Sequence, residues 1–473
     1  MNYKGILFFL GVYFIFFSFF SILNILYSFY FDFIIDLNSY LITFVLSLLL
    51  GSLFYYIGRN HNKDISLTDQ IILILLSFFI IPFIISIPYQ FSIYDISLLN
   101  SYFESVSGLT ATGFSVIPEV DHIDQPLILW RSSSQWMGGL LFLISTIGTI
   151  GSKQIKIKPA YLLSGGASGR NFYNNFNYNF VKILLIYFFS TIFVIFLYSL
   201  TDLRLLDSVN LAFTSMSAGG FIPKSDLSGI LLNNFQIFVF SITLLFPILN
   251  FFLFHDIITR KFLFNNYLED LHLILLIILS TLLFYFFLVQ EDGLANIFFA
   301  VTSSISTSGI ATYSPSTDLS LFFILLTFVG GALISTSSGF KYTRIYILLK
   351  ISYQEIYRLV KPINVIDKNL FNSEVKIDDQ DVKIAFLVFL LFIVSIFILS
   401  TILTFDYLTF ENSFKLSILT LTNTVNSSLH GLDNLSFVDL NNFTKISLIF
   451  FMIVGKVEII AVVYLIKRFI FRE

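Results

Sequence analysis

Four short polar segments with small residues interrupt the hydrophobic stretches of this chain. They are residues 110–114 (Thr-Ala-Thr-Gly-Phe), 217–221 (Ser-Ala-Gly-Gly-Phe), 306–310 (Ser-Thr-Ser-Gly-Ile) and 423–427 (Asn-Thr-Val-Asn-Ser). In a membrane, non-helical backbone survives only where it is buried in protein or lines an aqueous path. Carbonyl oxygens from four such segments around one axis could replace the hydration shell of a cation. These residue types therefore favour ion coordination by the backbone.

The spacing of the segments indicates duplicated structural units. Gly113, Gly220 and Gly309 follow one another at intervals of 107 and 89 residues, and Asn426 follows after another 117 residues. The fourth segment thus carries Asn where the others carry Gly. Asn is the residue that, after Gly, best tolerates a positive φ, so the backbone at Asn426 could adopt the glycine conformation. The Asn426 amide could also add a ligand or a constriction at this repeat.

The composition is that of an integral membrane protein. Of 473 residues, 56% are hydrophobic and only 12% are charged, 60 are Phe, and the mean hydropathy is +0.86. With no cysteine, the chain has no disulfide, thiolate metal site or cysteine nucleophile, and its five histidines form no ligand cluster in the sequence.

Ten apolar stretches are long enough to cross a bilayer. They lie at about 5–30, 38–57, 70–90, 126–150, 179–200, 234–258, 270–289, 320–350, 382–404 and 443–470. We expect the first to be a retained transmembrane helix and not a cleaved signal peptide. Shorter helical stretches at 98–109, 208–216, 294–305 and 412–421 precede the polar segments and are predicted to be re-entrant pore helices.

The spans and short helices predict an all-α integral membrane protein. The family resemblance given below implies that it has four membrane–pore–membrane repeats around a pseudo-fourfold pore and two extra N-terminal helices. We divide the chain into an N-terminal hairpin (1–66) and pore repeats 1 (67–152), 2 (153–260), 3 (261–351) and 4 (352–473). Repeats 2 and 4 begin with hydrophilic linkers at 153–177 and 352–381, and the last helix of repeat 3 is broken.

The distribution of charge predicts the orientation of the chain. All but five of the 27 Lys and Arg residues fall on one side, the side of both termini, which is the cytoplasmic side by the positive-inside rule. The outer segments carry acids, among them Glu104, Asp226 and Asp318, and an acidic vestibule would concentrate cations.

Two features lie below the expected filter. Residues 330–339 place Gly and Ser inside a predicted span, where such clusters bend or interrupt helices. Lys456 lies near the middle of the last span, and a charge at that depth is costly and usually functional. Lys456 and Glu458 are two positions apart and cannot face one another on a helix. A kink and a structural ion pair with another acid are the simpler alternatives.

The chain resembles the bacterial Trk/Ktr potassium-transporter superfamily, and most of all its Trk-H-type membrane subunit. The matching motifs are residues 103–113 followed by Trp130-Arg131 and by 135–139, the Gly/Ser-rich stretch 330–341, and Gly-Lys-Val-Glu-Ile at 455–459. The first two spans resemble the extra N-terminal pair of the Trk-H branch. The fourth repeat of the family usually has Gly where this chain has Asn426.

The resemblance implies K⁺ uptake across the bacterial plasma (inner) membrane through a selective, channel-like pore, with K⁺ as the transported ion and no organic cofactor or enzyme activity. It implies a homodimer gated by a cytoplasmic nucleotide-binding ring of the Trk-A type, in contact with lipid and not with nucleic acid. The expected filter residues are Ala111, Thr112, Gly113, Ala218, Gly219, Gly220, Thr307, Ser308, Gly309, Val425 and Asn426. Among these, the expected K⁺ ligands, through backbone carbonyls, are Thr112, Gly113, Gly219, Gly220, Ser308, Gly309, Val425 and Asn426. The expected gating residues are Gly331, Ser335, Thr336, Ser337, Ser338, Gly339, Lys341 and Lys456.

Three alternatives remain open from the sequence. Asn426 allows a transporter of the same fold that passes Na⁺ as well as K⁺. An ion-coupled secondary transporter usually shows inverted repeats and ionisable residues at the midplane, where this chain offers Lys456 and Glu458 alone. A membrane-embedded enzyme would need clustered His, Asp or Glu within the spans, and the sequence shows no such cluster.

Overall fold

The computed structural model describes residues 2–60, 66–92, 94, 96–117, 119–150, 176–259, 266–288, 293–315, 318–360, 369–372, 376–432 and 435–471. Within these ranges the chain is helical, as predicted, apart from one isolated bridge between Asn369 and Lys376. Most of the linker predicted at 153–177, part of the linker at 352–381 and the domain boundaries placed at 152–153 and 260–261 lie outside the described residues.

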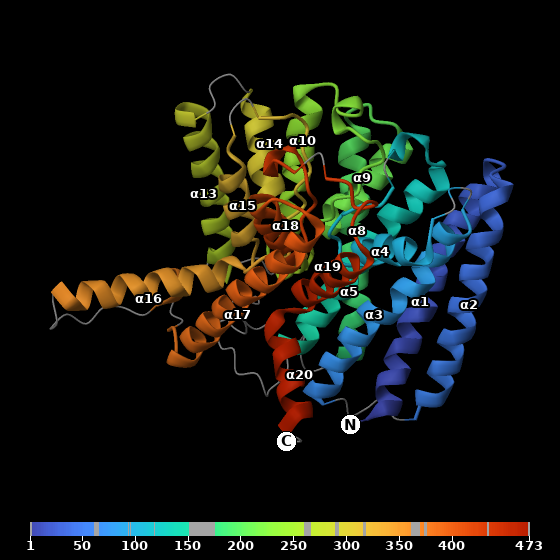
Figure 1. Cartoon of the computed structure of the whole chain (residues 1–473), viewed down its shortest axis with the longest axis horizontal. Coiled ribbons are helices and arrows are strands. Elements are labelled where there is room, and N and C mark those ends of the chain that lie inside the picture. The colour runs from blue at the N-terminus through green and yellow to red at the C-terminus, as the bar shows by residue number, and fades with distance from the viewer. Residues whose placement is uncertain are drawn as a thin grey trace.

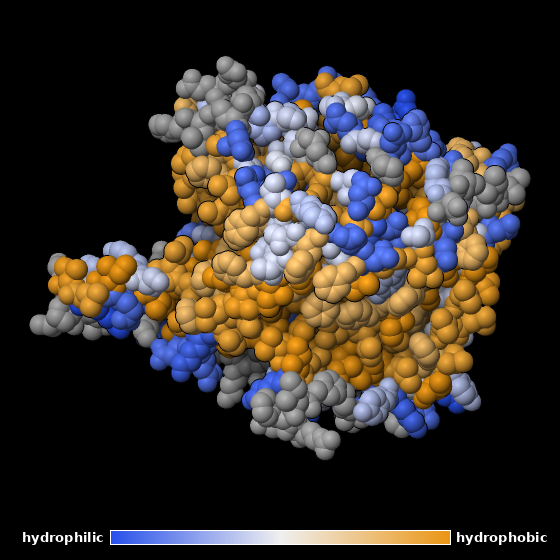
Figure 2. Space-filling view, in the orientation of Figure 1, coloured by the Kyte–Doolittle hydropathy of each residue, from blue (hydrophilic) through white to orange (hydrophobic). Residues whose placement is uncertain are grey.

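Long apolar helices form an upright bundle whose hydrophobic belt is flanked by hydrophilic residues at both ends (Figure 2). By length and composition, six described helices could cross a membrane, or up to eight if each of two bent pairs is counted as one span. The six are α1 (Tyr3–Tyr30), α2 (Ile34–Gly58), α3 (Leu67–Gln90), α8 (Phe176–Ser199), α13 (Leu268–Leu283) and α17 (Asp379–Leu403). Both termini lie at the same end of this bundle (Figure 1).

Four shorter helices precede the polar segments at the positions predicted from the sequence. They are α4 (Leu98–Leu109), α9 (Leu205–Ser217), α14 (Leu294–Ile305) and α18 (Phe410–Thr422). Ser97 and Thr409 cap α4 and α18 by accepting hydrogen bonds from Asn100 N and Asn412 N. At about 1.5 Å per residue these helices are roughly 18–20 Å long, short of the ~30 Å hydrocarbon core.

Two predicted spans are broken within the membrane-spanning length. The span at 234–258 consists of α10 (Asn234–Thr243), α11 (Leu245–Ile248) and α12 (Phe251–Ile258), with a bend of 99°. The last span consists of α19 (Asn442–Val457) and α20 (Ile459–Phe471), which also meet at 99°. The bend in this second pair lies at Glu458, whose φ is +73°.

The span predicted at 320–350 is wrong as a single crossing. Only α15 (Ser320–Val329) lies in the bundle, and α16 (Tyr342–Val360) projects sideways from it (Figure 1). The cause is the polar stretch between them, which is not helical. α16 is less apolar than the other long helices because it carries Arg344, Lys350, Glu355 and Arg358.

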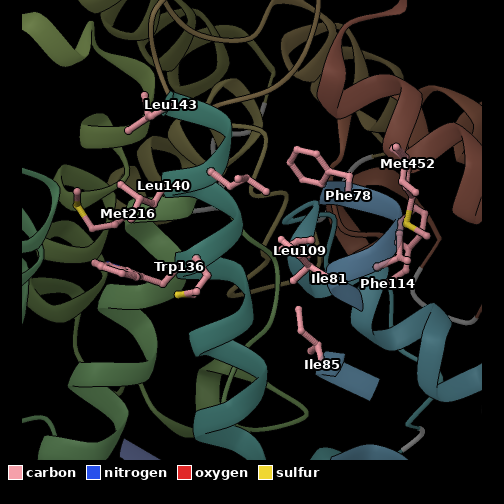
Figure 3. Packing of buried hydrophobic residues seen from close by; sticks show 14 of the residues in the cluster. Phe78, Ile81, Ile85, Leu109, Phe114, Trp136, Leu140, Leu143, Met216 and Met452 are labelled. Carbon is pink, nitrogen blue, oxygen red and sulfur yellow. The ribbon is translucent and has the colours of Figure 1, made fainter. Parts of the chain in front are cut away.

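The core holds the short helices against the long ones. Leu109 at the end of α4 and Phe114 just beyond it lie beside Phe78 and Ile81 of α3 and Met452 of α19 (Figure 3). On its other side, α5 (Gln125–Ile150) packs against α9, with Trp136 and Leu140 facing Met216 (Figure 3). The polar segments therefore begin from helix ends that are fixed by close packing.

Candidate functional site

The four short helices end with the same backbone turn. The first residue of each turn has a left-handed conformation: φ is +58° at Ala111, +57° at Ala218, +63° at Thr307 and +51° at Asn423. In three of the turns the next N–H bonds to the carbonyl five residues earlier, from Thr112 to Ser107, Gly219 to Thr214 and Thr424 to Leu419, each at 2.9 Å. The shared turn directs each chain away from its helix in a similar way.

This turn corrects the register of the fourth segment. Two residues beyond the left-handed position lie Gly113, Gly220 and Gly309, and in the fourth segment Val425. Paired hydroxyls give the same register, since Thr110 and Thr112, Ser306 and Ser308, and Thr422 and Thr424 are hydrogen-bonded at 2.7–3.0 Å.

The equivalence of Asn426 with the three glycines is therefore wrong by one residue. The tolerance of Asn for positive φ is used in this segment, but at Asn423, where the turn begins. Asn426 instead donates from Nδ2 to Leu432 O at 3.0 Å. The residue that replaces the fourth glycine is Val425.

The four segments converge closely around one point. A Cβ built on Gly113 would lie 2.6 Å from Gly220 Cα, and one on Gly220 would lie 2.4 Å from Val425 Cβ. A Cβ on Gly309 would lie 2.7 Å from Val425 O. Gly113 and Gly309 also have φ of +87° and +69°, which disfavours any side chain. The expected filter residues of all four repeats are thus brought together.

Several amides of these segments bond to carbonyls of their own helices. Gly113 N and Gly309 N bond to Ser107 O and Ser303 O, at 3.5 Å and 3.1 Å. Behind the ring, Thr214 and Ser303 donate their hydroxyls to the carbonyls of Phe221 and Ile310, each at 2.7 Å. What the segments can present toward their common centre is carbonyl oxygen, the ligand chemistry of hard monovalent cations.

A buried ion pair supports the first two segments from behind. Glu104 is fully buried and accepts from Arg131 Nε at 3.0 Å, from Val116 N at 2.8 Å and from Ser115 Oγ at 3.0 Å. Gln135 Oε1 accepts from Phe221 N at 3.3 Å. Glu104 therefore holds backbone in place behind the segments, which is one of the two roles that its position in the first short helix suggests, and it does not belong to an acidic outer surface.

Asn423 joins the first segment, the fourth segment and the last span. Its Nδ2 donates to Thr112 Oγ1 at 3.0 Å and to Met452 O at 2.9 Å. Sequence reasoning assigned no role to this residue. Its position directly after an apolar helix, where Ala111, Ala218 and Thr307 occur in the other repeats, was the signal that could have found it.

A cavity of about 470 Å³ opens above the convergence point. It is lined by residues of all four segments, including Gly113, Gly220, Ile310 and Val425. Its charged lining residues are Asp226, Lys224 and Arg131, so Asp226 is the one carboxylate there among the described residues. The expectation of an acidic vestibule is therefore not met by this lining.

The Gly/Ser stretch between α15 and α16 lies directly against the other side of the segments. Ser338 N donates to Thr307 Oγ1 at 3.0 Å, and Thr336 Oγ1 donates to Met216 O at 2.9 Å. Its backbone also pairs with the break between α11 and α12, through Ala332 N to Ile248 O and Phe251 N to Ile334 O. We call residues 330–341 the underlying loop.

Lys341 ties the underlying loop together at its end. Its buried Nζ donates to Ser337 O at 2.5 Å, to Ser335 Oγ at 3.1 Å and to Ala332 O at 3.3 Å. The φ of Lys341 is +79°, an uncommon conformation that the surrounding contacts must maintain. Lys341, one of the expected gating residues, thus anchors the end of the underlying loop.

Lys456 contacts the same loop from α19. Its buried Nζ donates to Ser338 Oγ at 3.2 Å and lies 4.7 Å from the centre of the Phe142 ring. Glu458 instead pairs with Arg344 of α16 at 2.8 Å. Among the described residues Lys456 has no ion-pair partner, so the simpler interpretation as one half of a structural pair finds no support in this part of the chain.

Glu269 is a further residue that sequence reasoning missed. It is buried at the start of α13, and its Oε1 accepts from Leu333 N at 3.2 Å and from Thr343 Oγ1. One carboxylate thus joins α13, the underlying loop and the first turn of α16. The acid-bearing start of an apolar helix, Leu-Glu-Asp at 268–270, was the available signal.

Comparison with known proteins finds relatives that are all named as cation or potassium transport proteins. The family model TrkH, described as a cation transport protein, matches residues 294–470. An uncharacterized cation transporter, MJ1485 of Methanocaldococcus jannaschii, is 26% identical over 92% of this chain and 90% of its own length. The Trk system potassium uptake protein TrkG of Escherichia coli K12 is 26% identical over 93% and 92%.

A solved structure shares the fold over almost the whole length. The potassium transporter TrkH from Vibrio parahaemolyticus superimposes with a TM-score of 0.84, at 21% identity, covering 98% of each chain. The named relatives are membrane ion-transport proteins and not enzymes. These findings confirm the resemblance found in the sequence: the chain is similar to Trk system potassium uptake proteins over most of its length, and to the TrkH family model over residues 294–470.

Proposed function

We propose that this chain takes up K⁺ across the bacterial plasma membrane through a pore at the convergence of its four polar segments. The observation that carries the proposal is the ring of Gly113, Gly220, Gly309 and Val425, where four helix ends bring backbone within contact distance. Carbonyl dipoles can replace the hydration of K⁺ without a fixed charge that would trap the ion. The relatives named potassium uptake proteins support K⁺ as the transported ion.

In this proposal the chain consists of four membrane–pore–membrane repeats after an N-terminal hairpin. Each repeat supplies one short helix, α4, α9, α14 or α18, and one filter segment. Both termini are cytoplasmic, so the 470 Å³ cavity is the outer vestibule and the underlying loop faces inward. The ligands are the carbonyls of the expected filter residues, with Val425 in place of Asn426 at the fourth glycine position.

The underlying loop is the proposed gate. It is buried against the segments by bonds to Met216 and Thr307, and Lys456 places a positive charge beside it. We assign release of this loop to a cytoplasmic nucleotide-binding ring of the Trk-A type acting on a homodimer. The sideways course of α16, which begins directly after the loop, would allow such a partner to pull on it (Figure 1).

The function is tested by rescue of growth at low K⁺ in a bacterium that lacks its own K⁺ uptake systems. Flux of K⁺, Rb⁺ and Na⁺ into liposomes containing the purified protein then measures selectivity. Absence of K⁺ flux in well-folded protein, with and without the partner, would overturn the proposal. Deleting part of 332–338 should raise basal flux, and an unchanged basal flux would reduce the loop to a kink.

A second candidate is a pore of the same fold that also passes Na⁺. Val425 favours it, because an apolar side chain stands where the other three segments have glycine. A comparable flux of Na⁺ and K⁺ in the same liposomes would select this candidate. Strict dependence of K⁺ flux on a second ion would instead indicate a coupled secondary transporter.

A further inference from the structure

The Val425 side chain points across the ring and comes within contact distance of the second segment. Helix packing sets the order of the repeats: α5 contacts α9, α10 contacts α14, α15 contacts α18, and α19 contacts α4. The second and fourth segments are therefore opposite one another. A Cβ on Gly220 would nevertheless lie 2.4 Å from Val425 Cβ and 2.9 Å from its Cγ1. The valine thus reaches across to the glycine of the facing segment.

The Val425 backbone also contacts an oxygen of the third segment. Val425 N donates to Ser308 O at 3.4 Å. Ser308 is the residue before Gly309 and is one of the expected ligands. An ion at this level meets a methyl-bearing side chain from the fourth segment and a carbonyl from the third that is already hydrogen-bonded.

The valine cannot move back easily, because the chain after it is braced. Asn426 Nδ2 bonds to Leu432 O and Ser428 Oγ bonds to Tyr313 O, both at 3.0 Å. Behind the segment lies the fully buried ring of His430, whose Cε1 is 3.1 Å from the Cβ position of Gly309. Burial lowers the pKa of His430 to about 3, so this ring is a neutral support at physiological pH.

We infer that Val425 is the specificity-determining residue of this pore. Its side chain narrows the pore at the ring and offers no oxygen ligand to the ion. The inference rests on the proposed function. Valine is stiff at χ1, so the constriction persists without a large rotamer change. It should limit flux and act most strongly against ions larger than K⁺, because their passage needs the greatest displacement of the side chain.

The test measures K⁺ and Rb⁺ flux per folded protein in liposomes for Val425→Gly, Val425→Ala and Val425→Ile. We expect K⁺ flux to rise severalfold in the glycine variant and less in the alanine variant, and to fall in the isoleucine variant. The Rb⁺/K⁺ flux ratio should rise in the order Ile, Val, Ala, Gly. If the glycine variant does not fold, the alanine and isoleucine variants still test the inference, because they should change the K⁺ flux and the Rb⁺/K⁺ flux ratio in opposite directions.

Val438→Gly is the matched control, because it makes the same change in the same repeat at a side chain that is 40% exposed. It should leave both the flux and the Rb⁺/K⁺ ratio as in the parent. Equal ratios in all Val425 variants, in a parent that does transport K⁺, would overturn the inference and leave the proposed function intact. A parent without K⁺ flux would overturn the proposed function first.

Discussion

The filter segments and the underlying loop are both buried, non-helical and rich in small residues, yet they are held in opposite ways. In the filter, most backbone N–H groups bond to carbonyls of the same repeat, as Thr112 does to Ser107 and Gly219 to Thr214. In the loop, Ala332 N and Ser337 N bond to Ile248 O and Pro247 O, and Leu333 N bonds to Glu269.

This difference separates a rigid element from a releasable one. The filter keeps its shape mainly through its own helix ends, because most of its backbone hydrogen bonds are local, and Asn423 and Val425 add links between segments. The shape of the loop depends on α11, α13, α19 and the third filter segment at once, so a shift of any of these can loosen it. The gate that we propose requires a second arrangement of these contacts.

The largest effect should come from filling the filter ring. Gly220→Asp places a side chain where the Cβ alone would lie 2.4 Å from Val425 Cβ, and it adds a charge that holds cations. K⁺ uptake should fall to background while the protein still inserts in the membrane. Gly293→Asp is the matched control, because a Cβ there meets nothing within 4 Å. Selective uptake by a well-expressed Gly220→Asp protein would count decisively against the filter.

The next effect concerns the charge beneath the ring. An ammonium about 6 Å from a cation, at an effective dielectric near 20, repels it by ~3 kcal/mol. Half of this would slow transit about tenfold. Lys456→Gln should therefore raise K⁺ flux by about that factor, or lower the need for the partner, whereas Lys456→Arg should behave like the parent.

Flux per correctly folded protein is the deciding quantity for Lys456. Its hydrogen bond to Ser338 Oγ also tethers the loop, so Lys456→Gln should raise basal flux by both routes. A lower flux per folded molecule, together with a lower melting temperature, would show that Lys456 is mainly structural.

A smaller effect should follow from cutting the tether at α13. Glu269→Met keeps most of the side-chain volume but leaves Leu333 N without its acceptor, and an unmet buried donor costs about 1–3 kcal/mol. Basal flux should rise severalfold because the loop loses its link to α13 and α16.

The conservative change provides the control for Glu269. Glu269→Gln retains an oxygen acceptor for Leu333 N and should stay close to the parent. Glu355→Gln alters an exposed acid of α16 whose pair with Arg358 is at the surface, where such pairs contribute little. Equal basal flux in the Met and Gln variants would show that the hydrogen bond between Glu269 and Leu333 has no role in gating.

Much of the architecture was predictable from the sequence, because the length of an apolar stretch and the positions of small residues determine locally where a helix runs and where it ends. The four short helices, the polar turns after them and the break at 330–339 follow from the sequence. The register of the fourth segment does not follow, since Asn423 and Asn426 are equally suited to positive φ, and only the hydrogen bonds distinguish them.

Long-range contacts account for the other differences. The partners of Lys456 and Glu458 come from the loop and from α16, more than a hundred residues away in sequence. The course of α16 depends on the loop that precedes it, and the 320–350 stretch alone has the apolar length of a span. Glu269 is visible in the sequence as an acid at a helix start, but its bond to Leu333 is not.

The smallest effect should come from the single hydrogen bond that joins the two regions. Thr307→Val keeps the branched shape but removes the acceptor of Ser338 N, so the melting temperature should fall modestly and basal flux should rise less than in Glu269→Met. Thr312→Val is the control for stability, because among the described residues the buried Thr312 hydroxyl has no hydrogen-bond partner. If the filter is rigid by itself, the Rb⁺/K⁺ ratio of Thr307→Val stays at the parental value while its basal flux changes. A changed Rb⁺/K⁺ ratio would mean that the shape of the filter also depends on the underlying loop. The proposed difference between a locally held filter and a loop held by other helices would then be wrong.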